Sequence, residues 1–103
     1  MLELGWSEWK NRRNIRKHGF DFADAAQIFQ GPLLARLDIR EDYGEDRWRG
    51  IGMLQGRVVV VVFAEPRPGL VRIISLRKAN RHERRAYEKA IRERLEASRC
   101  HER

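Results

Sequence analysis

The stretch RVVVVVFAE, residues 57–65, decides the fold because it contains the longest apolar run in the chain. The run is far shorter than the roughly 20 apolar residues that a membrane-spanning helix requires. It predicts a central strand that is buried on both faces. Gln55-Gly56 before it and Pro66–Gly69 after it predict tight turns. These turns lead to strands expected at residues 47–54 and 70–77, and such short connections make consecutive strands antiparallel neighbours.

Two helices are expected before the strands. Ser7 is positioned to cap a first helix that ends near Lys17, and Gly19 follows where a helix stops. Asp21 is positioned to cap a short second helix, which ends at Gly31-Pro32. The apolar residues of this second helix recur at helical spacing and form one stripe: Phe22, Ala25, Ala26 and Phe29.

One more strand and a last helix complete the expected elements. Residues 33–40 alternate in polarity and predict a strand, which a polar loop at residues 41–46 joins to the next strand. Asn80 is positioned to cap a helix that runs to about Ser98. The stripe of this helix that is expected to be buried consists of Tyr87, Ile91 and Leu95.

Length and composition favour one small globular domain. The chain has 103 residues, of which 42% are hydrophobic, so it is long enough for one modest core. The predicted fold class is α+β, with two N-terminal helices, a four-stranded antiparallel meander sheet and a C-terminal helix. The domain is expected to span residues 1–103, with a loose tail from about residue 99.

The net charge points to a polyanionic partner. Lysine and arginine number 22 against 15 acidic residues, which gives a net charge of +7. A nucleic acid, an anionic membrane or an acidic protein would satisfy this charge, and the alternative is a well-charged surface without such a partner. Two basic blocks, residues 10–18 and 72–85, flank an acidic stretch at residues 21–46. If the fold brings the two blocks together, they form one anion-binding surface.

Cysteine usage restricts the compartment and the kind of site. Cys100 is the single cysteine, so an internal disulfide and a tetrahedral metal site built on cysteines are both excluded. This usage fits a reducing compartment, and the N-terminal residues show no secretory signal, so a cytoplasmic location is expected. No cofactor and no metal are predicted.

Motifs spread over residues 6–88 resemble the BrnT toxins of bacterial type II toxin–antitoxin systems. The N-terminal part of the pattern is Trp6, Lys10, Asn14, Lys17-His18-Gly19, Phe22, Ala25-Ala26 and Phe29. The later parts are Glu45-Asp46-Arg47, Gly52, the strand RIISLRKA at residues 72–79, Arg81, Glu83-Arg84-Arg85 and Tyr87-Glu88. Ser7 departs from the pattern, because the family usually has aspartate there, but either residue can cap a helix.

The resemblance implies a RelE-like ribonuclease fold and a toxin that cleaves RNA and arrests growth. It also implies neutralisation by a BrnA-like antitoxin that carries a DNA-binding element. Toxin and antitoxin are then expected to form a hetero-oligomer that represses its own operon, so operator DNA is contacted only through the antitoxin. We expect the antitoxin to cover the basic blocks and to compete there with RNA.

Metal-independent RNA cleavage uses the ribose 2′-OH as an internal nucleophile. It needs a base, an acid and cations around the phosphorane. His18, at a helix end, is either the acid or base or a cap that satisfies helix carbonyls. Arg72 and Arg77 would point to opposite faces of an ideal strand, although a turn at the strand end could redirect Arg77. The candidate catalytic residues are His18, Arg72, Arg77, Lys17 and Arg47.

Several of these candidates have a structural alternative. Arg47 follows Glu45 and Asp46, so a local salt bridge competes with a phosphate contact. Arg72 could be merely solvated, and Arg77 could pair with the acidic stretch.

The remaining basic residues are expected to grip RNA. The candidate RNA-binding residues are Lys78, Arg81, Arg84, Arg85 and Tyr87. A solvated face is the alternative for the cations, and Tyr87 either stacks on a base or packs in the core. Because no clear acid–base pair is visible, a second function stays open. In it the chain is a non-catalytic basic module that binds nucleic acid or a protein partner.

Overall fold

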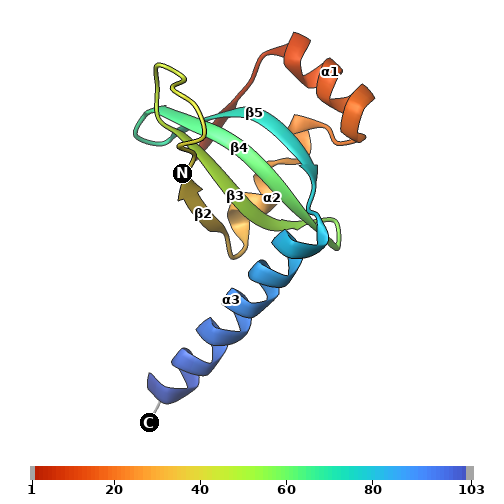
Figure 1. Cartoon of the computed structure of the whole chain (residues 1–103). Helices are drawn as coiled ribbons and strands as arrows, with labels where there is room; N and C mark the ends of the chain where they lie inside the picture. The colour runs from red at the N-terminus through yellow and green to blue at the C-terminus, as the bar shows by residue number, and fades with distance from the viewer. Residues whose placement is uncertain (1, 102–103) are drawn as a thin grey trace.

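The computed structural model describes the backbone of residues 2–101 and the side chains through Leu95. Figure 1 shows a curved sheet with helices behind it and a long C-terminal helix leading away from it. In chain order the elements are β1 (Glu3–Gly5), α1 (Glu8–His18), the 3₁₀ turn η1 (Phe22–Asp24), α2 (Ala26–Gln30), β2 (Leu34–Leu37), β3 (Arg47–Leu54), β4 (Arg57–Arg67), β5 (Leu70–Lys78) and α3 (Arg81–His101).

The sheet has five strands in the order β1-β5-β4-β3-β2. The strands β2 to β5 form the predicted antiparallel meander, with Gly50 opposite Val61 and Val61 opposite Leu76. The prediction of a four-stranded, purely antiparallel sheet is wrong in one respect, because β1 adds a parallel strand at the edge of β5. Its three residues are too short to show an alternating pattern, and its partner lies far away in the sequence.

The N-terminal helices and β2 also differ in detail from the expectation. The second helix is split into η1 and the five-residue α2, although Asp21 caps η1 as expected by accepting from the Ala23 N–H at 2.9 Å. Ser7 precedes α1, but its side chain makes no capping hydrogen bond. The strand expected at residues 33–40 is only Leu34–Leu37, because the Asp38 carboxylate turns the chain by accepting from the Arg40 N–H.

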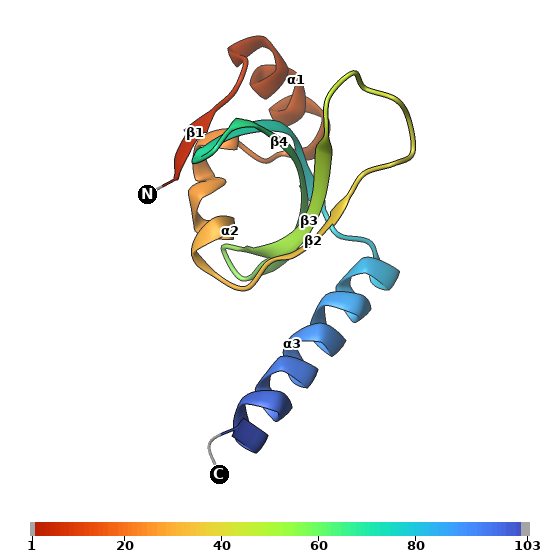
Figure 2. The ribbon, with the colours of Figure 1, turned by 90° about the vertical axis from the view of Figure 1, so that its left-hand side faces the viewer.

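One face of the sheet packs against α1, η1 and α2, as the edge-on view in Figure 2 shows. Val59, Val61 and Phe63 of β4 point into this core, and Val60 is fully buried from the other side, as predicted for a central strand. Gly52 of β3 leaves the space that α2 occupies. A Cβ atom there would lie 2.7 Å from Ile28 Cγ2.

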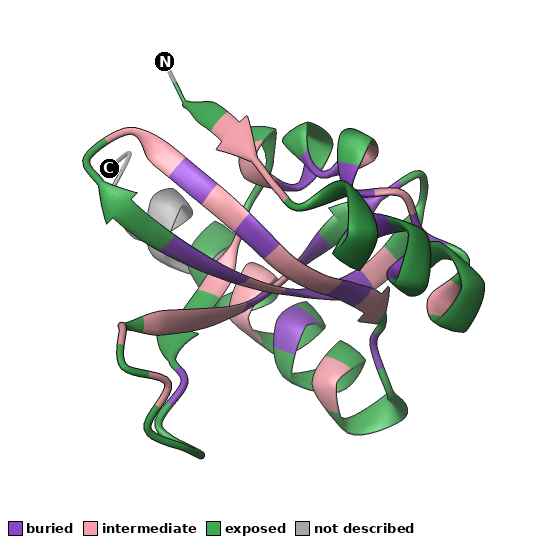
Figure 3. Cartoon of the chain, turned by 90° about the horizontal axis from the view of Figure 1, so that it is seen from above, coloured by how far each residue is buried: buried purple, intermediate pink, exposed green. Residues whose placement is uncertain are grey.

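A β-bulge in β5 decides which way its arginines point. Val62 pairs with Ser75 and the next residue, Phe63, pairs with Ile73, so Ile74 is an extra residue in the ladder. Figure 3 shows buried and half-buried residues interspersed along the strands. The core-facing residues of β5 on both sides of the bulge are Val71, Ile73 and Leu76. Arg72 and Arg77 therefore share the opposite, open face, and the ideal-strand expectation of opposite faces is wrong.

The helix α3 covers only one end of the open face. Asn80 and Glu83 form a capping box, in which each side chain accepts from the other residue's backbone N–H at 2.8 and 2.9 Å. Tyr87 is buried, and its hydroxyl donates to the Pro32 carbonyl at 3.0 Å. Leu95 is 61% exposed, so the stripe predicted to be buried does not extend that far. The reason is that α3 leaves the sheet and projects from the body (Figure 1).

The C-terminal helix is longer than expected, because it passes Ser98 and continues to His101. The expected loose tail from residue 99 therefore starts within this helix, and residues 102 and 103 lie outside the described residues. Along the described chain, no helix combines the length and the apolar character that crossing a membrane would need.

Candidate active site

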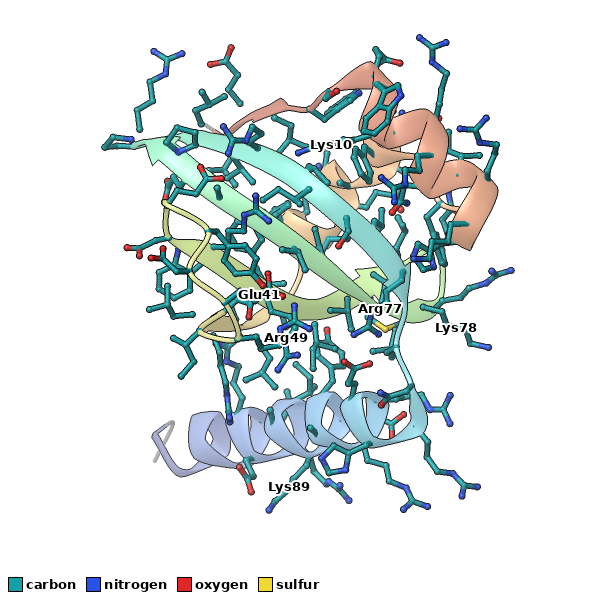
Figure 4. The ribbon with its side chains drawn as sticks, turned by 45° about the horizontal axis from the view of Figure 1, so that its top comes forward. Lys10, Glu41, Arg49, Arg77, Lys78 and Lys89 are labelled. Carbon is teal, nitrogen blue, oxygen red and sulfur yellow. The ribbon has the colours of Figure 1, made fainter. Side chains whose placement is uncertain are left out.

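The open face of the sheet is a row of arginines over an apolar floor. The central strand β4 supplies the floor, because Val60, Val62 and Ala64 alternate onto this face. The neighbouring strands supply the cations: Arg36 from β2, Arg47 and Arg49 from β3, and Arg72 and Arg77 from β5. Arg49 and Arg77 both lie in the space between the sheet and α3 (Figure 4).

Carboxylates already bind three of these arginines, Arg77, Arg72 and Arg47. Arg77 donates through Nη1 and Nη2 to the two carboxylate oxygens of Glu83, both at 2.8 Å. The hydrogen bonds from Arg77, with the Asn80 N–H and the charges of Arg77 and Arg49, lower the pKa of Glu83 from 4.5 to about 2. This contact is bidentate, and a guanidinium group can bind a phosphate in the same geometry.

Arg72 and Arg47 share a second carboxylate, that of Glu45 in the loop before β3. Arg72 Nη2 donates to Glu45, and Arg47 Nε lies 3.5 Å from the same carboxylate. The hydrogen bond from Arg72, then its charge and that of Arg47, lowers the pKa of Glu45. The Arg47 guanidinium also stacks over the ring of Tyr43 at 4.3 Å. The predicted local salt bridge of Arg47 is therefore present, and it belongs to a network with Arg72.

The loop that carries Glu45 is itself anchored by Asp38. The carboxylate of Asp38 is buried and accepts from Arg40 Nη2 at 2.7 Å and from the Tyr43 hydroxyl at 3.3 Å. These hydrogen bonds, led by the one from Arg40, hold the pKa of Asp38 well below its ordinary value. The loop thus stands beside the open face, on the side of the sheet away from α2 (Figure 2).

His18 and Lys17 lie at the edge of this face, where α1 ends. Gly19 adopts a left-handed φ of 78°, and its N–H donates to the Ile15 carbonyl at 2.8 Å, so the helix is closed by Gly19. Burial lowers the pKa of His18, and the nearby charges of Lys17 and Arg77 lower it further. The imidazole is therefore neutral at pH 7 and is free to accept a proton.

Asn14 fixes the position of His18 against the sheet. Its buried amide donates to the carbonyls of Leu76 and Phe20 at 2.9 and 3.0 Å, and its oxygen accepts from the Leu76 N–H at 3.1 Å. Asn14 thus pairs with the edge of β5 just beyond the bulge, in place of a neighbouring strand. This contact brings the end of the first basic block to Arg77 in the second block.

The predicted RNA-binding residues divide into two groups. Lys78, Arg81, Arg84 and Arg85 are exposed at the end of β5 and on the first turns of α3, next to the open face. Tyr87 is 4% exposed and its hydroxyl is engaged by Pro32, which favours the packing alternative over stacking on a base.

Arg36, Arg49 and the carboxylates of Glu45 and Glu83 were not among the predicted site residues. The alternation of Arg47 and Arg49 along a strand was the available signal for Arg49. Glu83 was visible only as a neighbour of arginines, because its pairing with Arg77 depends on the tertiary structure. Among the described residues, no group of three or more histidine, cysteine, aspartate or glutamate side chains could hold a metal ion.

The α+β fold gathers several arginines on one open face of the sheet, which gives this face a cationic surface. The family model described as "Ribonuclease toxin, BrnT, of type II toxin-antitoxin system" matches residues 6–83. The chain belongs to this family, which confirms the resemblance seen in the motifs.

A solved structure supports the same family. The chain is similar to the ribonuclease toxin BrnT of Brucella abortus, known from a 1.1 Å crystal structure. The two share 30% identity with a TM-score of 0.62, over 79% of this chain and 100% of the other. Comparison with curated proteins gives no match.

Proposed function

We propose that the chain is an endoribonuclease toxin that cleaves RNA without a metal, through attack of the ribose 2′-OH on the adjacent phosphate. The observation that carries the proposal is the bulge at Ile74, which places Arg72 and Arg77 on one open face. Such a face presents several guanidinium groups to one strand of RNA. Each group fits a phosphate through two parallel hydrogen bonds.

Arg72 and Arg77 would stabilise the extra negative charge of the phosphorane. Both are held by carboxylates, so a phosphate has to take the place of Glu45 or Glu83 at the guanidinium. Arg47, held by Glu45 and by the ring of Tyr43, would orient the neighbouring phosphate. Lys78, Arg81, Arg84 and Arg85 would hold the flanking nucleotides, mainly through their charge.

His18 would act as the general base on the 2′-OH. A neutral imidazole accepts a proton, and burial together with the positive charges of Lys17 and Arg77 lowers the pKa of His18 and so favours this form. Lys17 would contribute positive charge beside the reacting phosphate. Substitution of His18 should therefore change the pH profile of RNA cleavage.

The family also supports a protein partner. We propose a BrnA-like antitoxin that neutralises the toxin in a hetero-oligomer and through which alone operator DNA is contacted. With cellular RNA as the substrate, we propose that the toxin acts in the cytoplasm. The net charge of +7 favours an acidic surface on the antitoxin.

The test is cleavage of end-labelled RNA, as naked RNA in the presence of EDTA and separately in a translating extract without EDTA. We expect products ending in a 2′,3′-cyclic phosphate or 3′-phosphate, and no cleavage at a site that carries a 2′-deoxyribose. Arg72→Ala and Arg77→Ala should each lower the rate about 10²–10³-fold, because each removes a donor to the phosphorane.

The matched control is Arg67→Ala. Arg67 also belongs to the β4–β5 hairpin and also pairs with a carboxylate, that of Glu3. It lies next to the hairpin turn, and its side chain is 68% exposed. Its loss should leave the rate within about 3-fold of the wild type. RNA that binds but stays intact in both settings would favour the non-catalytic module. Cleavage of naked RNA that EDTA abolishes would contradict the metal-independent mechanism.

A further inference from the structure

A groove separates α3 from the β3–β4 hairpin, at the end of the open face away from the Glu45 loop. Its volume is about 860 Å³. Met53 and Val58, which are cross-strand neighbours, form one wall, and Ile91 and Leu95 of α3 form the other. Leu95 is 61% exposed and Met53 is 39% exposed, so apolar surface is open to solvent on both walls.

The rim of the groove is strongly basic. Arg57 and Lys78 come from the sheet, and Arg84 and Arg92 come from α3, against the single acidic residue Glu88. The floor is completed by Tyr87, whose hydroxyl is already bound to the Pro32 carbonyl. The groove therefore combines an apolar floor with a cationic rim.

We propose that this groove binds an amphipathic acidic segment of the cognate antitoxin, an inference that rests on the partnership proposed above. Apolar side chains of the segment would fill the space between Met53 and Leu95, and its carboxylates would meet the cations of the rim. This is the helix-in-groove mode of recognition, in which apolar anchors supply affinity and charges supply orientation.

The two other occupants fit the groove less well. The phosphates of RNA would pair with the cations of the rim. However, the apolar surface of the groove offers RNA no exposed aromatic ring for stacking, because Tyr87 is buried. A second copy of this chain would bring the same basic rim and another +7 of charge to the contact. An acidic peptide segment matches both the floor and the rim.

The position of the groove links antitoxin binding to the active face. Arg84 lines the groove, whereas its neighbour Glu83 holds Arg77 on the arginine face. One end of the groove, at Arg84, therefore lies next to the Arg77–Glu83 pair, and the groove runs from there along α3 to Leu95. The rest of the antitoxin would then cover the arginines next to it.

The test measures binding of the labelled, purified cognate antitoxin to the folded toxin by fluorescence anisotropy, with no RNA present. Leu95→Asp places a carboxylate on the exposed α3 wall of the groove, and we expect the Kd to rise at least about 10-fold. Arg84→Glu reverses a rim charge and should raise the Kd and its salt dependence. The matched controls are Leu2→Asp, at a leucine that is 48% exposed outside the groove, and Arg67→Glu.

Loss of affinity in the groove variants, with wild-type affinity in both controls and unchanged circular dichroism, supports the inference. Wild-type affinity in Leu95→Asp and Arg84→Glu overturns it. Self-association of the toxin alone that Leu95→Asp abolishes overturns it in favour of a second copy. If Leu95→Asp lowers the affinity for RNA that carries a 2′-deoxyribose at the cleavage site as much as it lowers the affinity for the antitoxin, the groove is assigned to RNA. Because the assay measures antitoxin binding and not cleavage, its outcome can be interpreted even if the chain proves not to cleave RNA.

Discussion

Replacing Glu83 by glutamine should change how the stability of the protein depends on pH. The substitution keeps the size of the side chain and its contact with the Asn80 N–H, but it removes the charge that faces Arg77. In the folded protein the pKa of Glu83 is lowered from 4.5 to about 2. The unfolded chain therefore binds this proton more tightly than the folded protein does. The stability from the pair is complete above pH 4.5 and is lost as the pH falls towards 2.

The expected size follows from the same shift. One pKa unit corresponds to about 1.4 kcal/mol, so the full shift corresponds to about 3 kcal/mol. The side chains of Arg77 and Glu83 are 33% and 14% exposed, and solvent screens part of the interaction. We therefore expect roughly 1–3 kcal/mol of unfolding free energy to depend on this one carboxylate.

The measurement is urea unfolding of wild type and Glu83→Gln at several values between about pH 7 and pH 2.5. The wild type should be more stable than the variant at neutral pH, and the difference should shrink steadily below about pH 4.5. The control is Glu3→Gln, because Glu3 and Arg67 are 69% and 68% exposed and should contribute little. Parallel pH curves for wild type and Glu83→Gln would refute the assignment of a strong Arg77–Glu83 pair.

Three further substitutions test other parts of the structure. His18→Ala should abolish most RNA cleavage with little change in Tm, and the wild-type rate should fall only below about pH 6.5, since the pKa of His18 is lowered. Asn14→Ala should cost about 2–4 kcal/mol in urea unfolding, because it leaves buried groups of Leu76 without partners. Gly52→Ala should cost about 1–3 kcal/mol, because its Cβ would meet Ile28 at 2.7 Å, and a thermal melt will show the loss.

The sequence was most informative where the structure depends on local pattern. The valine run, the turn at Gln55-Gly56 and the strand at residues 47–54 depend on local sequence, and all three were predicted. The strand β1 could not be predicted, because its few residues become a strand only by pairing with the distant β5. Leu95 follows a helical stripe, but no local pattern shows that α3 has already left the sheet at that point.

The candidate site was predictable in composition but not in arrangement. Arg47, Arg72 and Arg77 were selected from the sequence as cations, and the structure gathers them on one face. The bulge that aligns Arg72 with Arg77 has no sequence signal, since Ile74 resembles its strand neighbours. The partners Glu45 and Glu83 were read as parts of charged segments, because their contacts depend on chain crossings that the sequence does not reveal.

The pairing of Arg72 and Arg77 with carboxylates would make the proposed RNA binding at this face an exchange of one anion for another. Each phosphate that reaches a guanidinium releases the carboxylate of Glu45 or Glu83, which then attracts cations from the solution. This uptake of cations by the carboxylates offsets part of the counterion release from the RNA. The slope of log K against log salt should therefore be shallower than about −0.7 per phosphate contacted. A single nucleotide would compete with a tethered carboxylate at one arginine, whereas an RNA strand would replace both carboxylates at once. The arginine face would therefore select for chain length before it selects for sequence.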